Sequence, residues 1–477
     1  MVSGEISFVT MDQIRKIRGK ALEFLQSSGV YMDHPEMLKR LAAAGAQVDE
    51  AMNKVRFPRE FVEEYLGMMP QKFTLSGYQR GHAVSLPHPE GSFYTRTCTG
   101  APNWIDPDTG DYREVSIHDV GLWARLIQEL DQIDFVPFPS PTDVPVATAD
   151  VHALAVTLQN TNKHIWVQPY SQASVPFLID LLIAKAGGLE NLRQAPLASM
   201  ITCSLTPFVF KGMDLEVILQ AAPKGIPLFP CSLPTAGTTA PITSPGSVLV
   251  AVIENLVLLV SGQVVQPGIP MVATSLQFSA DMQSGRSLQS SVEAIRQSAF
   301  FVQVMRKGFH VPAHTYGSGS DSVSLDAQCM LERAMQTMAV ASSGADILGG
   351  FGQLETASTI SPVQAVIDNE IVGMIRSLLS GFHLDDDVLG WRELITGKPG
   401  NEFLTSDHTL SHFRESFVPN LFIRQTRTEY ERNGGRDLLQ KTTSRYFDII
   451  ENASEINIFM NNDIKSILEA ADKKLNF

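Results

Sequence analysis

Short apolar segments rich in β-branched and aromatic residues alternate with amphipathic helical patterns along most of this 477-residue chain. Strands that alternate with helices pair in parallel through right-handed crossovers, which leaves a closed barrel or an open doubly wound sheet. Eight such units within about 290 residues favour the barrel, since TIM-type barrels commonly hold about 250 residues. The predicted strands are residues 93–98, 133–138, 164–167, 198–203, 227–231, 271–276, 311–316 and 346–351.

The spacing of apolar residues also predicts how the chain is divided. Helical patterns separate the strands at residues 118–130, 173–186, 245–260, 291–306, 326–341 and 363–379. Residues 1–90 have mostly helical patterns, and the chain after residue 380 continues through a connector into charged helices. We therefore predict an α/β protein: an N-terminal helical segment (1–90), a (β/α)8 barrel (91–380), and a C-terminal helical extension packed on the barrel (381–477).

Charge and cysteine content narrow the class of protein. The 37 Lys and Arg against 51 Asp and Glu give a net charge of −14, which disfavours nucleic-acid binding. Four cysteines without a CxxC pair are typical of a reducing compartment. The N-terminus has no signal-peptide pattern, and Glu254 and Asn255 interrupt the longest apolar run below the ~20 residues that span a bilayer. We expect a cytoplasmic protein without membrane segments.

The active site of a (β/α)8 barrel lies where the strands end and the following loops begin. At these positions the chain is rich in aromatic, amide, hydroxyl and small residues, and nearly all of its ionisable side chains there are Arg96, His314, Asp321 and Glu355. No carboxylate pair, metal triad or GxSxG elbow occurs, which disfavours hydrolysis. His408 and His412 have helical spacing but no obvious third ligand, so no protein-bound metal is expected.

This set of residues suits a quaternary ammonium group. Such a cation has no N–H to donate and is held by the faces of aromatic rings, at about 0.5–2 kcal/mol per ring. The alternative for each ring is a packing role, because aromatic side chains at strand ends often cover the core. The candidate rings are Tyr94, Trp104, Trp166, Tyr170, Tyr316 and Phe351.

A glycine-rich segment, Gly317 to Ser322, follows the seventh predicted strand. It has no third glycine at the dinucleotide-binding position and no GK[ST], so it is neither a Rossmann fingerprint nor a P-loop. Its glycines permit close approach of a large ligand to the backbone, and a plain turn is the alternative.

Four segments, in their order and spacing, resemble the trimethylamine methyltransferase superfamily over nearly the whole chain. They are residues 99–113, 316–322 with the helix at 326–332, 344–350 and 407–414. The resemblance implies transfer of a methyl group from an amine to the Co(I) centre of a corrinoid on a separate small protein. Some members carry pyrrolysine in the loop that matches 316–322, whereas this chain has only standard residues there. Members without pyrrolysine resemble quaternary-amine demethylases, with glycine betaine as the best-known substrate class.

The resemblance also implies roles for individual residues. No side chain is assigned as catalytic, because Co(I) is the nucleophile. The carboxylate of a betaine is expected to contact His314, Gln353, Arg96 or backbone N–H groups of the 317–319 turn. The predicted substrate-binding residues are Tyr94, Trp166, Tyr170, His314, Tyr316, Phe351 and Gln353, and the predicted cofactor-facing loop comprises Gly317, Ser318, Gly319 and Asp321.

Other functions stay open at this point. The substrate could be another quaternary amine, namely carnitine, proline betaine or γ-butyrobetaine. The chain could also be a betaine-binding protein without catalytic activity, or a barrel methyltransferase working between a corrinoid and a folate. Apolar helices such as 248–260 leave a homo-oligomer open as well.

Overall fold

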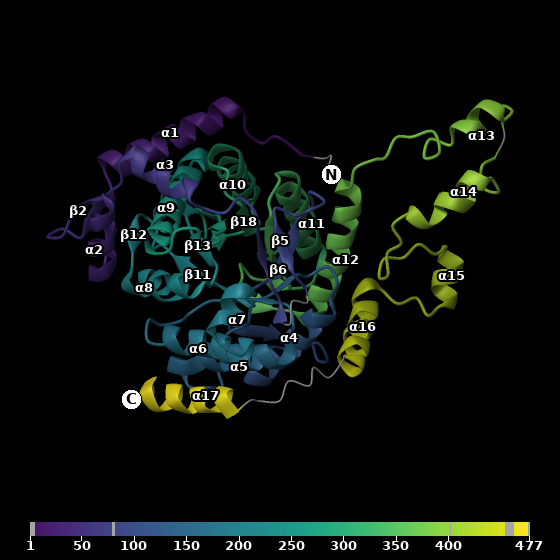
Figure 1. Ribbon diagram of the computed structural model, residues 1–477. Helices are drawn as coiled ribbons and strands as arrows, with labels where there is room; N and C mark the ends of the chain where they lie inside the picture. Colours follow the sequence, from purple (N-terminus) through teal and green to yellow (C-terminus); the bar gives the residue numbers. More distant parts are fainter. Residues whose placement is uncertain (1–4, 79–81, 401, 454–461, 476–477) are drawn as a thin grey trace.

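The centre of the molecule is a closed barrel of eight parallel strands (Figure 1). The computed structural model describes residues 5–78, 82–400, 402–453 and 462–475. Around the barrel the strands follow in the order β10-β11-β13-β15-β18-β19-β6-β9. They are β6 (Tyr94–Thr97), β9 (Phe135–Val136), β10 (His164–Val167), β11 (Ala198–Cys203), β13 (Leu228–Ser232), β15 (Ala273–Ser275), β18 (Ala313–Tyr316) and β19 (Ile347–Phe351). The predicted barrel is confirmed, and every predicted strand segment overlaps one of its strands.

A hairpin closes the amino end of the barrel. Strands β4 (Phe73–Leu75) and β5 (Val84–Leu86) pair antiparallel and pack against the side chains that fill the interior. Nδ1 of His164, on β10, lies 2.7 Å from the carbonyl oxygen of Ser76, beside the hairpin. The hydroxyl of Tyr94, on the first residue of β6, accepts from the N–H of Ser85 at 3.2 Å. A ligand therefore reaches the interior from the carboxyl end.

Helices cover the outside of the barrel, and each predicted helix of this region is present. Their amphipathic or wholly apolar sequences follow from burial against the strands. They are α4 (Ile117–Glu129), α5 (Ala149–Asn160), α6 (Val175–Ala186), α7 (Leu189–Gln194), α8 (Gly212–Ala221), α9 (Ser244–Val265), α10 (Val292–Gln303) with a π-helical turn at Val304–Phe309, α11 (Ala327–Ser342) and α12 (Pro362–Leu379).

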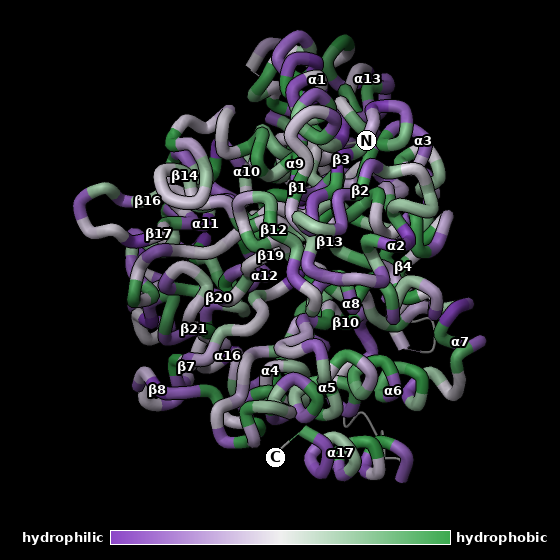
Figure 2. The backbone as a smooth tube through the Cα atoms, turned by 90° about the vertical axis from the view of Figure 1, so that its left-hand side faces the viewer, coloured by the Kyte–Doolittle hydropathy of each residue, from purple (hydrophilic) through white to green (hydrophobic). Residues whose placement is uncertain are grey.

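The N-terminal segment packs over α9 and explains its composition. Helices α1 (Met11–Ser27), α2 (Pro35–Ala44) and α3 (Arg59–Gly67) contact the outer face of α9, while β13 and β15 contact its inner face (Figure 2). In the described part of the chain α9 is the one helix long and apolar enough to cross a membrane, and 89% of its most apolar window is buried inside the protein. A helix buried on both sides is apolar all round.

The same segment corrects the prediction that residues 1–90 are mainly helical. It also contains β1 (Val30–Met32), β2 (Gln47–Asp49) and β3 (Lys54–Arg56), which form a sheet with β12 (Val209–Phe210), and the hairpin of β4 and β5. These strands are only three residues long or shorter, too brief for a clear two-residue alternation. The barrel elements run from Tyr94 to Leu379, and the predicted boundaries near 90 and 380 stay a prediction.

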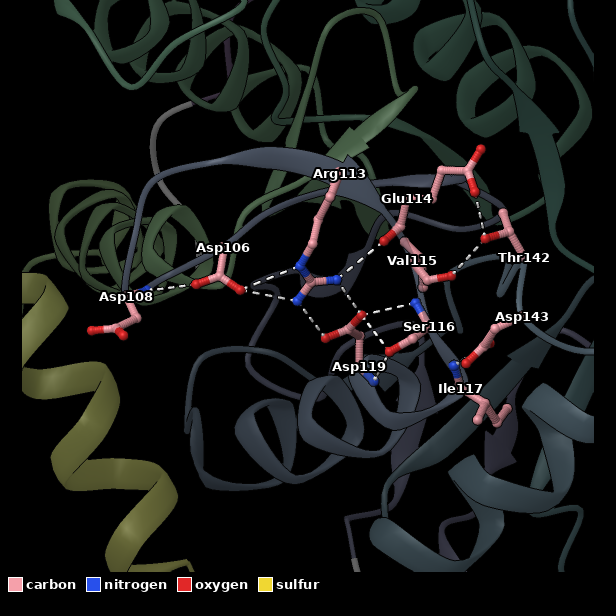
Figure 3. Close-up of polar contacts among 10 residues, drawn as sticks. All are labelled: Asp106, Asp108, Arg113, Glu114, Val115, Ser116, Ile117, Asp119, Thr142 and Asp143. Atoms are coloured by element: carbon pink, nitrogen blue, oxygen red, sulfur yellow. Dashed lines mark hydrogen bonds and ion pairs between the residues drawn. The ribbon is translucent and has the colours of Figure 1, made fainter.

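Two small sheets cover the carboxyl end of the barrel. One contains β7 (Asn103–Ile105), β8 (Tyr112–Glu114), β20 (Gln353–Leu354) and β21 (Thr359–Ile360), and the other β14 (Thr235–Ala236), β16 (Phe278–Ala280) and β17 (Ser287–Leu288). Figure 3 shows how Arg113 of β8 ties the first sheet to α4. Its guanidinium lies 3.0 Å from a carboxylate oxygen of Asp106 and 2.6 Å from one of Asp119.

The C-terminal extension packs on the barrel only in part, which corrects the prediction. Helix α16 (Leu438–Asn452) contacts α4 and α12, and α17 (Asn462–Leu475) contacts α5 and α6. Helices α13 (Trp391–Thr396), α14 (Asp407–His412) and α15 (Arg427–Arg432), which lie between α12 and α16 in the chain, stand away from the body in Figure 1. These three helices hold no buried residue.

Candidate active site

Arg96 lies inside the barrel near its carboxyl end, one residue before the end of β6, and is 1% exposed. Its Nε donates to Nε2 of His314 at 2.7 Å, and its Nη1 donates to the carbonyl oxygen of Thr97 at 2.7 Å. Cζ lies 4.2 Å from the ring centre of Trp166 and 5.9 Å from that of Tyr316. Among the described residues no acidic side chain pairs with Arg96, and Nη2 has no hydrogen-bond partner.

His314, on β18, is neutral. Burial, together with the positive charge of Arg96, holds the pKa of His314 well below its usual value. A guanidinium has no acceptor, so Nε2 must be the unprotonated nitrogen and Nδ1 carries the proton. Nδ1 donates to Oγ1 of Thr274 at 3.3 Å. The basic nitrogen of His314 is therefore occupied by Arg96, and the ring is not poised to accept a proton from a substrate.

Gly349 gives Arg96 and His314 their space. On β19 this residue lies opposite Tyr316 of β18 in the strand register. A Cβ there would lie 2.7 Å from Nε2 of His314 and 2.9 Å from Cζ of Arg96, closer than real Cβ contacts. The glycine that the 344–350 segment carries at this position thus has a local physical reason.

Aromatic rings line the space around this pair. Trp166, on β10, lies 6.1 Å from Phe229 and 6.2 Å from His314, measured between ring centres. Nearer the carboxyl end, Tyr316 lies 6.1 Å from Phe278 in an edge-to-face arrangement. Phe278 is half-buried, as are Cys203, Leu233 and Ala357, which pack against the interior cluster.

The segment from Gly317 to Asp321 is locked in place, unlike a plain turn. The N–H groups of Gly317 and Ser318 both donate to the carbonyl oxygen of Gly349, at 2.9 and 3.0 Å. The Asp321 carboxylate accepts from the N–H groups of Gln289 and Ser290, at 3.0 and 2.9 Å. Burial raises the pKa of Asp321. The polar groups of the segment bond to neighbouring parts of the protein, and the cofactor-facing role of the segment stays a prediction.

Gln353, on β20, lies beside this loop. Its Nε2 donates to Oε1 of Gln289 at 2.9 Å and to the carbonyl oxygen of Ser318 at 3.4 Å. A Cβ at Gly350, whose φ is +97°, would lie 2.7 Å from Nε2 of Gln353 and 3.0 Å from Cδ1 of Tyr316. The structure thus places Gln353 next to Tyr316, with both of its donors in use.

Other predicted residues lie elsewhere in the structure, and their role in substrate binding stays a prediction. Tyr94 is at the amino end of the barrel, where it lines a pocket of about 700 Å³ with His88 and Arg376. Phe351 and Trp104 belong to the core between barrel and helices, outside the interior cluster. The ring of Tyr170 also packs against that outer core, and burial raises the pKa of its hydroxyl to about 12. Trp166, His314, Tyr316 and Gln353 remain near one another.

Sequence reasoning missed several residues of this region. Phe229 lies inside β13, before the strand end, and Phe278, just after β15, was not among the candidate rings. Thr274 was included only as part of a strand end. Glu254, on α9, accepts from Ser204 and Thr206 and from the N–H of Phe208, so it holds the loop after β11. Two-residue alternation along β13 is the signal that could have found Phe229.

Metal ligation has no counterpart in the described residues, where no group of three or more His, Cys, Asp or Glu could hold an ion. His408 and His412 stack with ring centres 4.5 Å apart, and Nδ1 of His412 lies 2.7 Å from a carboxylate oxygen of Glu415.

Comparison with known proteins decides the family. The family model described as trimethylamine methyltransferase (MTTB) matches residues 3–474. The chain belongs to this family. It is a methyltransferase of the trimethylamine methyltransferase family, as the four sequence segments predicted.

Individual relatives of this methyltransferase differ in the substrate that they are named for. The chain is 27% identical over 442 residues to the trimethylamine methyltransferase MttB of Desulfitobacterium hafniense, covering 92% of this chain and 88% of that protein. It is 26% identical over 422 residues to the glycine betaine methyltransferase of the same species, covering 88% of this chain and 87% of that protein. Such similar identities leave the substrate to be argued from the site.

A solved structure supports the fold of this methyltransferase. The monomethylamine methyltransferase MtmB of Methanosarcina barkeri superposes with a TM-score of 0.53 at 13% identity, covering 94% of this chain and 90% of that one.

Proposed function

We propose that this methyltransferase moves a methyl group from a quaternary amine, glycine betaine in the first place, to the Co(I) centre of a corrinoid carried by a separate small protein. The products are the methylated corrinoid and dimethylglycine. The proposal places the reaction in the cytoplasm and includes no protein-bound metal, nucleic acid or membrane. Its main support is the cluster of Arg96, His314, Trp166 and Tyr316, which offers rings and donors but no acid or base poised for proton transfer.

The chemistry balances without a proton transfer. In an in-line displacement the electron pair of Co(I) forms the new bond to the methyl carbon as the C–N bond breaks. The bonding pair stays on nitrogen, so a cationic quaternary amine leaves as a neutral tertiary amine. A neutral His314 whose Nε2 is bonded to Arg96 fits a reaction that needs no general base.

The protein's part in this reaction is to bind and orient the substrate and to exclude water. The hairpin of β4 and β5 closes the amino end, so the substrate and the corrinoid protein both approach the carboxyl end. Rings near that end, Tyr316 and Phe278, are available to contact methyl groups on the cation. Too strong a hold on the ground-state cation would slow the displacement, so a partial cage is favourable.

Carnitine, proline betaine and γ-butyrobetaine are the competing substrates, and a non-catalytic betaine-binding protein is the competing class. The relative named glycine betaine methyltransferase supports the first choice over these. Trimethylamine, for which other relatives are named, is a weaker candidate, since the loop from Tyr316 to Ser322 contains only standard residues.

The test is spectroscopic. The purified protein is incubated with Co(I) cobalamin and separately with glycine betaine, carnitine, proline betaine, γ-butyrobetaine, choline or trimethylamine. We expect loss of the Co(I) band and growth of methylcobalamin with glycine betaine, with dimethylglycine formed in equal amount. Methyl transfer from trimethylamine alone would overturn the substrate class. Binding of glycine betaine without any transfer, even with a cognate corrinoid protein added, would favour the non-catalytic reading.

A further inference from the structure

The interior of the barrel holds a positive charge that the described protein does not neutralise. Arg96 is 1% exposed, and no acidic side chain of the described residues pairs with it. Taking a charge out of water costs several kcal/mol unless an opposite charge and hydrogen bonds compensate it. The two bonds of Arg96, to His314 and to the carbonyl oxygen of Thr97, go to neutral acceptors. An anion that enters the barrel would therefore gain from a charge that the fold has already buried.

Hydrogen bonding singles out Arg96 among the groups that a carboxylate could contact. The one N–H of the His314 ring donates to Thr274. Both N–H groups of the Gln353 amide are used, by Gln289 and by Ser318. The backbone N–H groups of residues 317 and 318 both donate to residue 349. In the 317–319 turn only the N–H of Gly319 makes no such bond to a described residue, and each of the other donors would have to give up an existing bond to bind an anion.

Two donors in the same cluster carry no such bond. Nη2 of Arg96 and Nε1 of Trp166 are buried and lack a hydrogen-bond partner among the described residues. The side chains that carry them are stacked, with Cζ of Arg96 4.2 Å from the Trp166 ring centre. Buried polar groups are normally hydrogen-bonded, so two free donors on stacked side chains point to an acceptor that comes from outside the fold. A carboxylate is an acceptor of the right charge, and its bonds to a guanidinium are among the stronger hydrogen bonds.

We infer that Arg96 is the anchor for a substrate carboxylate, so the substrate is a zwitterion that carries both a carboxylate and a quaternary ammonium group. This inference rests on the proposed function and narrows it. Arg96 touches the substrate in this account as a binding residue and takes no part in bond breaking.

The anchor also sets the direction in which the substrate lies. The guanidinium of Arg96 covers a face of Trp166, so that face is closed to the substrate cation. The positive charge of Arg96 also repels the ammonium group of the substrate. The carboxylate therefore points inward, and the ammonium group points toward Tyr316, Phe278 and the carboxyl end. There its methyl groups meet the approaching corrinoid.

The dimensions of the cluster favour a short zwitterion. Only 5.9 Å separates Cζ of Arg96 from the ring centre of Tyr316. A betaine whose two charges are one methylene apart can contact both at once, whereas a longer chain, as in γ-butyrobetaine, carries its ammonium group past that ring. Glycine betaine and proline betaine are the members of the short class.

The experiment measures binding to the full-length protein alone by titration calorimetry, with glycine betaine, γ-butyrobetaine and choline as probes. Choline has the same trimethylammonium group but no carboxylate. The wild type should bind glycine betaine at least about 30-fold more tightly than choline, the range expected for truncating one partner of a buried charge pair. Arg96→Met should abolish this preference, and Arg96→Lys, which keeps the charge but not the planar fork, should retain part of it.

Thermal unfolding without ligand guards against a folding artefact. Arg96→Met removes an uncompensated buried charge, so the unfolding midpoint of this variant should not fall below that of the wild type. If Arg96 served only the fold, its replacement would lower the midpoint. Gln289→Leu is the competing variant, because Nε2 of Gln289 is also buried without a partner. Loss of the carboxylate preference in Gln289→Leu but not in Arg96→Met would overturn the assignment, as would equal binding of choline and glycine betaine by the wild type.

The outcome is separable from that of the proposed function, because binding needs no corrinoid. Methyl transfer from glycine betaine with the same KM in wild type and Arg96→Met would overturn the assignment of Arg96 and support the proposed methyl transfer. An Arg96-dependent preference for glycine betaine without methyl transfer would support the assignment of Arg96 and overturn the proposed reaction.

Discussion

Two fully buried arginines in neighbouring regions differ in whether a carboxylate neutralises their charge. Arg333, on α11, lies 2.7 Å from a carboxylate oxygen of Asp368 on α12, and neither side chain is exposed. Its Nη1 also donates to Ser318 at 3.2 Å, and its Nε to Sγ of Cys329 at 3.2 Å. Among the described residues, Arg96, inside the barrel, has only neutral partners and one nitrogen without a hydrogen bond.

The difference separates a residue that serves the fold from one that is available to a ligand. Between the helices, Asp368 neutralises Arg333 and also accepts from the N–H of Gly352 at 2.6 Å, which ties the loop after β19 to α12. Inside the barrel, the unneutralised charge is a cost to stability that binding of an anion can recover. Function is commonly obtained at such a cost to stability.

The largest effect expected from this comparison is on Asp368. Asp368→Ala would leave Arg333 buried without its counter-ion, and we expect the free energy of unfolding to fall by about 3–5 kcal/mol. Urea unfolding followed by circular dichroism measures it. The double variant Arg333→Met/Asp368→Leu should lose clearly less than Asp368→Ala, since no unpaired charge remains. Equal losses in the two proteins would mean that charge compensation is not what Asp368 supplies.

The next effect concerns Gly349, which makes room for the unneutralised arginine. In Gly349→Ala the new Cβ would collide with His314 and Arg96. A displacement of about 1 Å at a positioning residue can lower activity about 100-fold, and we expect a loss of this order in methyl transfer from glycine betaine. The matched control is Gly19→Ala in α1, where a Cβ meets nothing within 4 Å. That change should leave transfer unaffected and raise helix stability by up to about 1 kcal/mol. Full activity of Gly349→Ala would contradict the tight fit.

The barrel interior that buries the charge of Arg96 should also disfavour a positive charge on a histidine, which can lose its proton. Burial lowers the pKa of His164 to about 4, from an ordinary value of 6.5. The unfolded chain therefore takes up a proton before the folded one does as the pH falls below 6.5. Stability from this histidine is complete above pH 6.5 and declines by about 1.4 kcal/mol per pH unit down to pH 4. His314, whose pKa is lowered by burial and by Arg96, should steepen the decline.

Urea midpoints at pH 7, 6 and 5 measure this dependence. His164→Gln, which cannot take up a proton, should flatten the profile over the same range. An identical profile in His164→Gln would assign the pH dependence to other groups.

The smallest effect belongs to a third arginine, Arg113, whose contacts are drawn in Figure 3. Its side chain is 38% exposed. It contacts two carboxylates, but solvent screens much of the interaction. Arg113→Met should lower the free energy of unfolding by about 1 kcal/mol or less, and added salt should shrink the difference from wild type. A loss as large as that of Asp368→Ala would show that exposure does not separate these arginines.

The barrel and its helices could be predicted from the chain because burial dictates composition along each element. For example, α9 is apolar on every side because barrel strands cover one face of it and N-terminal helices cover the other. The extension from α13 to α15 could not be placed, since its helices are short and its apolar side chains, such as Leu404 and Leu410, are 75% and 63% exposed.

Side-chain direction inside the barrel was only partly predictable. Strict alternation along β19 would turn Phe351 inward with Ile347, but the pairing with β6 shifts register between Leu348 and Phe351. The irregularity leaves Ile347 in the interior cluster and Phe351 in the outer core. For Tyr94 the predicted strand 93–98 already placed the residue at the amino end, so its distance from the site at the carboxyl end followed from the strand itself.

The sequence by itself determined the closed barrel, the family and the short inventory of ionisable residues at the strand ends, because these depend on pattern and residue type. Only the tertiary structure decided which of those residues meet. Arg96 faces Trp166 and His314, and no acidic side chain in the described part of the chain pairs with it. This arrangement depends on contacts between strands far apart in the chain, which periodicity along one strand does not record. Whether a buried charge is neutralised is a property of the packed interior.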